Sequence, residues 1–138
     1  MKNVQILDCT LRDGGRIINC EFKDSTIYNI ANELTDAGID IIVSHMGLTK
    51  GGDVGTIEQS PLDVAAERSD QILRAAKDIN PRIITMCHGG SITSPEDAEY
   101  VMNHSAAVGF VGASSIERIP TEIAVKQVCK DYLSIKLK

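Results

Sequence analysis

Four polar segments, each following a short apolar run, carry the residue types that could do chemistry in this 138-residue chain. His45 and His88 lie in two of these segments, and an imidazole can give or take a proton near neutral pH. Arg12 offers a planar guanidinium to a carboxylate or phosphate, and Asp13 offers oxygens to a proton or a divalent metal. We therefore predict Arg12, Asp13, His45 and His88 as catalytic residues, with Asp13 also the candidate metal ligand.

The same segments contain glycines and hydroxyl groups that suit a small anionic ligand. Glycine lets backbone N–H groups approach an anion closely, and helix N-termini add positive dipole ends. The predicted binding residues are Gly47, Thr49, Gly51, Gly52, Gly89, Gly90, Gly112, Ala113, Ser114 and Ser115. Each feature also has a structural explanation, because glycine pairs form turns and buried histidines are often hydrogen-bonded core residues.

The elements that would position these residues alternate along the chain. Apolar runs at residues 4–7, 39–43, 83–86 and 108–111 predict strands, and the near-continuous ones indicate strands covered on both faces.

Four helical patterns follow these runs. The first helix is predicted from residue 24 to a stop at Gly38, and the second over 60–79, with Ser60 as its N-cap and Pro61 at its first helical position. The third starts at Ser94 in the same way. The fourth is predicted over residues 121–133, and its inward side chains are Ile123, Ala124, Val128 and Leu133.

This alternation predicts an α/β fold with four βα units and parallel strands in a single domain over residues 1–138. An eight-unit TIM barrel needs about 250 residues, so we expect a TIM-barrel-like half-barrel. Its two open sheet edges suggest a homodimer in which two copies pair into a closed eight-stranded barrel. A flavodoxin-like or open monomer is the structural alternative.

Composition limits the partners and the compartment. The net charge of -5 argues against nucleic acid or an anionic membrane as the main partner. The sequence starts without a signal-like apolar segment and has no run long enough to cross a membrane. Its four cysteines form no CxxC pair, so reduced thiols in the cytoplasm are expected.

The string Asp-Cys-Thr-Leu-Arg-Asp-Gly at residues 8–14 resembles the signature of the aldolase/metallolyase barrel family, which includes 4-hydroxy-2-oxovalerate aldolase and hydroxymethylglutaryl-CoA lyase. The resemblance covers residues 1–42. It implies that Arg12 steadies an enolate or carbonyl oxygen and that Asp13 binds a divalent metal. The His-x-His pair that completes the metal site of that family does not occur in this sequence.

From residue 37 to 138 the chain is similar to the phosphoenolpyruvate-hydrolase-like barrels, through the strings at 45–49, 86–90, 94–98 and 109–118. This resemblance implies that these units are the last three of eight and that their strand ends hold phosphate. Taken together, the two resemblances place a junction between families near residues 36–42.

The leading functional expectation is an enzyme-like site for a small phosphorylated or carboxylated acid of the phosphoenolpyruvate or pyruvate type. Arg12 would orient the acid group, and His45 and His88 would exchange protons. One alternative is a metal-dependent aldolase or lyase of 2-oxo acids, using Mg²⁺ or Mn²⁺. The other is a half-barrel assembly or chimera without catalysis.

Overall fold

A computed structural model describes residues 6–10, 22–53, 55–57 and 59–136 of the chain, so Arg12 and Asp13 lie outside the described residues. Strands and helices alternate, as predicted. In chain order they are β1 (Leu7–Asp8), α2 (Asp24–Asp36), β2 (Ile41–His45), α3 (Leu62–Ile79), β3 (Ile84–His88), α4 (Pro95–Asn103), β4 (Gly109–Phe110) and α5 (Arg118–Leu133).

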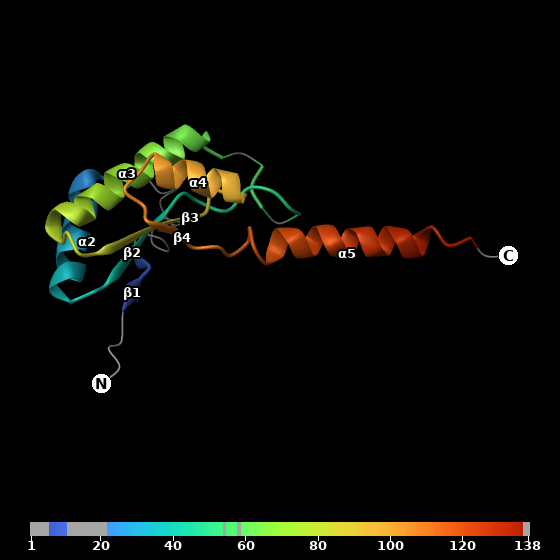
Figure 1. Cartoon of the computed structure of the whole chain (residues 1–138), viewed down its shortest axis with the longest axis horizontal. Helices are drawn as coiled ribbons and strands as arrows, with labels where there is room; N and C mark the ends of the chain where they lie inside the picture. The colour runs from blue at the N-terminus through green and yellow to red at the C-terminus, as the bar shows by residue number, and fades with distance from the viewer. Residues whose placement is uncertain (1–5, 11–21, 54, 58, 137–138) are drawn as a thin grey trace.

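The strands form one parallel sheet in the order β1-β2-β3-β4, which confirms the predicted α/β fold and is consistent with a half-barrel. The helix α3 packs on β2 and β3 and lies between α2 and α4 (Figure 1). The core is made mainly of aliphatic side chains from these elements, among them Ile27, Ala31, Ile42, Ile72, Leu73, Ile83, Cys87, Ile92 and Val101.

The central strands end later than the apolar runs predicted. β2 extends through Ser44 to His45, and β3 extends through Cys87 to His88. These residues stay in the ladder because their side chains have partners in the interior: the Ser44 hydroxyl donates to the Ser69 hydroxyl at 3.2 Å. Both histidines are therefore the last residues of strands.

Helix α4 begins as predicted, with Ser94 as its N-cap. The Ser94 hydroxyl accepts from the Asp97 N–H at 3.1 Å, and the Asp97 carboxylate accepts from the Ser94 N–H at 3.0 Å, which completes a capping box. Partial burial acts to raise the pKa of Asp97, but hydrogen bonds from Thr93 and Ser94 outweigh it and lower that pKa.

The predicted start of the second helix is wrong by one residue. Pro61, with φ −50° and ψ 153°, is the N-cap of α3, and no side chain caps the helix. The first helical hydrogen bond runs from the Ala65 N–H to the Pro61 carbonyl, so Ser60 lies one position too early to serve as the cap.

The predicted packing of the last helix is also wrong. No residue of α5 is buried, and Ile123, Val128 and Leu133 are 64%, 52% and 86% exposed. Figure 1 shows α5 running away from the body instead of returning along the sheet. Its apolar residues are spread around the helix, so they define no single face for the sheet to bury. Neither α5 nor any other described helix has the length and apolar character to cross a membrane.

Candidate functional site

The ends of β2 and β3 bring His45 and His88 together at the C-terminal end of the sheet. The two residues are register partners, and their ring centroids lie 5.0 Å apart with an interplanar angle of 48°. Both are buried, with 2% and 5% of their surface exposed. Two of the four predicted catalytic residues thus share one place, while Arg12 and Asp13 fall outside the described residues.

Backbone groups fix the proton positions on the two rings. The Gly47 N–H donates to Nδ1 of His45 at 3.0 Å, so a neutral His45 carries its proton on Nε2. Nδ1 of His88 lies 2.6 Å from the Val111 carbonyl, which can only accept. A neutral His88 therefore has its basic nitrogen at Nε2. The pair combines a potential acid and a potential base.

Backbone hydrogen bonds join the segment after β2 to the segment after β3. The Gly90 N–H donates to the Gly47 carbonyl at 2.8 Å, and the Lys50 N–H donates to the Gly90 carbonyl at 3.0 Å. Gly89 and Gly90 have φ of +77° and +63°, and a Cβ on Gly90 would lie 2.2 Å from the Met46 carbonyl oxygen. Glycine is needed here for a left-handed backbone and a close approach.

These bonds change the predicted role of two glycines. The N–H of Gly47 serves His45, and the N–H of Gly90 serves the Gly47 carbonyl. Each backbone N–H has one hydrogen to donate, so these two groups hold the histidine-bearing segments in place.

The predicted residues Gly51 and Gly52 face α5. A Cβ on Gly52 would lie 2.2 Å from the Glu122 carboxylate and 2.4 Å from the Arg118 guanidinium. Arg118 donates to the Gly51 carbonyl at 3.1 and 3.2 Å and pairs with Glu122 at 3.1 Å. The structure thus separates these glycines from the contacts that surround the histidine pair.

Two further contacts complete this attachment. Glu122 accepts from the Asp53 N–H at 2.9 Å, and Lys126 pairs with the Asp53 carboxylate at 2.5 Å. The hydrogen bond from Asp53, followed by that from Arg118, lowers the pKa of Glu122. We call residues 51–53 together with Arg118, Glu122 and Lys126 the loop clamp.

The remaining predicted binding residues lie at two other places. Thr49 is buried, with 8% of its surface exposed. Residues 112–115 are half-buried and form the turn before α5, where the Ala113 and Ser114 carbonyls accept from the N–H groups of Ile116 and Ile119.

Sequence reasoning missed two contributors to this region. Val111 acts through its backbone carbonyl, which leaves no signature in the sequence. The loop clamp does have a sequence signature: Arg118, Glu122 and Lys126 are spaced four residues apart, so they must share one face of a helix.

The described residues do not by themselves fit the predicted Mg²⁺ or Mn²⁺. Within the described ranges, no group of three or more His, Cys, Asp or Glu side chains could hold a metal ion. Mg²⁺ prefers oxygen ligands, whereas the pair at the ends of β2 and β3 offers imidazole nitrogens.

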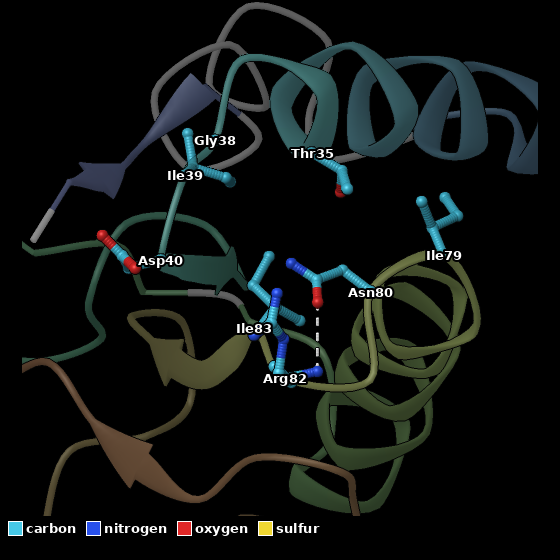
Figure 2. Close-up of a pocket in the computed structure, with 8 residues that line it drawn as sticks. All are labelled: Thr35, Gly38, Ile39, Asp40, Ile79, Asn80, Arg82 and Ile83. Carbon is cyan, nitrogen blue, oxygen red and sulfur yellow. Dashed lines mark hydrogen bonds between the residues drawn. The ribbon is translucent and has the colours of Figure 1, made fainter.

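A separate pocket of about 440 Å³ opens at the other end of the sheet. It is lined by residues just before β2 and β3: Thr35, Gly38, Ile39, Asp40, Ile79, Asn80, Arg82 and Ile83 (Figure 2). The Asp40 carboxylate accepts from the Ile6 N–H at 2.9 Å, which ties β1 to β2. In parallel α/β folds the ligand site lies at the C-terminal strand ends, so this pocket is not our candidate.

A parallel sheet with buried imidazoles at its C-terminal strand ends has the layout of a barrel-type α/β protein. The chain belongs to the phosphoenolpyruvate hydrolase-like family, whose family model matches residues 25–135. The match begins before residue 37 and includes α2 from its second residue onward. Residues 12 and 13 lie outside it, and neither the family match nor the relatives of the chain support the resemblance to the aldolase/metallolyase family.

These relatives occur in a plant and in a bacterium. Two tomato proteins (Solanum lycopersicum), the ToMV susceptible protein tm-1(GCR26) and the ToMV resistance protein Tm-1(GCR237), are 43% and 42% identical over 106 residues, which is 76% of this chain. The putative transcriptional regulatory protein y4pA of Sinorhizobium fredii is 33% identical over 105 residues, also 76% of this chain. The matched region spans 14% of the tomato proteins and 17% of the bacterial one.

Proposed function

We propose that the chain contributes a site for a small phosphorylated or carboxylated acid, of the phosphoenolpyruvate or pyruvate type, with His45 and His88 as an acid–base pair. The observation that carries the proposal is that two buried rings 5.0 Å apart have opposite backbone partners, an N–H at Nδ1 of His45 and a carbonyl at Nδ1 of His88. Membership of the phosphoenolpyruvate hydrolase-like family supports the ligand class.

In the proposed hydrolysis of phosphoenolpyruvate, water attacks phosphorus and the bond between phosphorus and the enol oxygen breaks. Nε2 of His88 takes a proton from the attacking water, while Nε2–H of His45 donates a hydrogen bond to the enol oxygen as its bond to phosphorus breaks. The proton taken up by His88 then passes to the enol oxygen, which gives phosphate and enolpyruvate, and enolpyruvate tautomerises to pyruvate. A positioned acid and base each contribute about 10²–10⁴-fold to such steps. The bonds from Gly47 and to Val111 hold the rings in the required tautomers.

The acid group of the ligand needs cationic or hydrogen-bonding partners as well. Arg12 and Asp13 follow β1, which pairs with β2 in the parallel sheet, so they belong to a segment that starts at the same end as His45. We propose Arg12 as the partner of the carboxylate, and Ser114 and Ser115 as hydroxyl donors to the phosphate. The proposal does not depend on an Mg²⁺ or Mn²⁺ ion on Asp13, so the experiment is run with and without each ion.

Calorimetry tests the binding step. Phosphoenolpyruvate, pyruvate and inorganic phosphate are titrated into the chain with and without Mg²⁺ or Mn²⁺, and pyruvate release is followed in parallel. We expect binding at millimolar concentration or below, lost in His88→Gln. The control is His104→Gln, because His104 is exposed at the C-terminal end of α4 and stacks on Tyr100.

The outcomes separate the alternatives. Binding without pyruvate release would retain the ligand class and remove the proposed hydrolysis. If none of the three compounds gives a measurable heat of binding, the proposal is refuted and a half-barrel without catalysis is favoured. Equal binding by wild type and His88→Gln would show that the histidine pair is structural.

We also propose that the chain works in the cytoplasm. Cys9, Cys87 and Cys129 are free thiols in the described structure, as a reducing compartment would keep them.

A further inference from the structure

The pocket at the N-terminal end of the strands contains a buried hydroxyl group without a hydrogen-bond partner. Oγ1 of Thr35 is shielded from solvent, and it makes no hydrogen bond within the described residues. A buried polar group left unpaired costs stability, so such a group beside a cavity indicates a missing partner. The volume of about 440 Å³ lies in the range of small-molecule sites, so a ligand could supply that partner.

Two hydrogen-bond donors lie across the pocket from Thr35 (Figure 2). Oδ1 of Asn80 accepts from the Arg82 N–H at 3.1 Å, which leaves the NH₂ group of Asn80 facing the pocket. The ion pairs of the described residues do not include Arg82, so its guanidinium has no carboxylate partner there. A guanidinium beside an amide suits a carboxylate, which accepts several N–H groups at once.

The opposite side of the pocket is electronegative. Thr35 lies in the last turn of α2, and the C-terminal end of a helix carries partial negative charge. Asp40 also lines the pocket; its carboxylate accepts from the Ile6 N–H at 2.9 Å and, in the part of the chain that the structure describes, forms no ion pair. Arg82 and Asp40 therefore bring opposite charges to one cavity without neutralising each other.

The remaining wall of the pocket is apolar. It is formed by three isoleucines from the last turn of α3 and from the segments that enter β2 and β3, namely Ile39, Ile79 and Ile83. Ile39 and Ile83 are 7% and 1% exposed, so the core fixes their positions. Such a wall favours a ligand that carries an aliphatic group as well as its charges.

We propose that this pocket binds a small α-amino acid with an aliphatic side chain. The ligand carboxylate accepts hydrogen bonds from Asn80 and Arg82. Its ammonium group donates to Oγ1 of Thr35 and is attracted by Asp40, while its side chain contacts the isoleucines. A ligand with a single charge would satisfy only one of the two sides, whereas the zwitterion satisfies both.

This site is separate from the histidine pair. His45 and His88 are the last residues of β2 and β3, whereas the pocket lies before the first residues of the same strands. The inference therefore does not depend on the proposed function. His88→Gln should leave amino acid binding unchanged, so the two proposals can fail independently.

Calorimetry with leucine and two analogues tests the ligand class. Isocaproate is leucine without its amino group, and isoamylamine is leucine without its carboxylate. We expect leucine to bind and each analogue to bind at least about tenfold more weakly, because hydrogen bonds to charged groups are the strong ones. Equal binding of either analogue would overturn the proposal.

Three variants test the assigned contacts. Arg82→Gln removes the cation, and Asn80→Asp keeps an acceptor for the Arg82 N–H but repels a carboxylate; each should weaken leucine binding about tenfold or more. Thr35→Val keeps the shape of the side chain without its hydroxyl. It should also weaken binding, yet the unliganded chain should be no less stable, because the hydroxyl that is lost has no partner among the described residues.

The matched control is Arg74→Gln. It makes the same change in net charge as Arg82→Gln, but Arg74 pairs with Asp70 on α3 and does not line the pocket, so leucine binding should persist. Circular dichroism checks that each variant folds.

Three further results would each overturn the proposal. One is the absence of saturable leucine binding up to about 10 mM. Another is equal leucine binding by wild type, Arg82→Gln and Asn80→Asp. The third is a loss of stability in unliganded Thr35→Val, which would show that the hydroxyl serves the fold instead of a ligand.

Discussion

Replacing Gly90 with alanine tests the packing that joins the two histidine-bearing segments. Gly90 has a φ of +63°, and an added Cβ would lie 2.2 Å from the carbonyl oxygen of Met46 and 2.7 Å from its Cβ. Both atoms belong to the backbone or stand directly on it, so no flexible side chain can move aside. The substitution must shift the segment after β2 or the segment after β3.

Two costs add up in Gly90→Ala. A left-handed backbone conformation costs a residue with a Cβ roughly 1–2 kcal/mol. Forcing an extra carbon into packed surroundings costs roughly 1–3 kcal/mol more. The expected loss is therefore about 2–5 kcal/mol, a large share of the roughly 5–15 kcal/mol by which domains are stable.

Gly38→Ala is the matched control. Gly38 has a φ of +80°, but nothing lies within 4 Å of the Cβ that would be added. This variant carries the conformational cost of about 1–2 kcal/mol without the collision. The difference between the two variants measures the close approach alone.

Urea unfolding followed by far-UV circular dichroism gives both free energies, since the chain has no tryptophan for a fluorescence signal. If Gly90→Ala loses no more stability than Gly38→Ala, the reasoning is refuted. The segments after β2 and β3 would then be too loosely packed to fix the rings of His45 and His88.

Three further results are expected. Asp97→Asn should lower the free energy of unfolding by about 1 kcal/mol at neutral pH. Because folding lowers the pKa of Asp97, the wild type should lose this extra stability over the variant as the pH falls below about 4. A difference in unfolding free energy that stays the same at every pH would contradict this. Burial raises the pKa of Cys87 to about 11, so iodoacetamide at pH 8 should label Cys129 and spare Cys87, as mass spectrometry would show. Arg118→Gln should speed hydrogen exchange at Gly51 and its neighbours with little change in Tm, and unchanged exchange would count against the loop clamp.

Local sequence chemistry predicted much of the fold. The alternation of apolar runs and helical patterns predicts the parallel sheet, because βα units need a crossover of this kind. The Ser-Pro-Glu-Asp segment predicts the start of α4, since the bonds of its capping box join residues within one turn. Features that depend on neighbours in sequence are the ones that a single sequence can predict.

The candidate site could be predicted only in part. Because parallel strands end at the same edge, His45 and His88 were expected to meet, and they do. The separate position of Gly51 and Gly52 against α5 was not expected, because it depends on pairs such as Arg118 with Gly51 that lie 67 residues apart. The choice of tautomers likewise depends on a carbonyl from the segment after β4.

By itself, the sequence determined which residues form strands and helices, their parallel order, and the meeting of two imidazoles at the end of the sheet. Only the tertiary structure decided where α5 goes. Apolar residues around a helix show that it needs cover, but the direction in which the chain leaves β4 determines what can supply that cover. Here the helix leaves the sheet and is held by three charged side chains, so its apolar residues stay exposed.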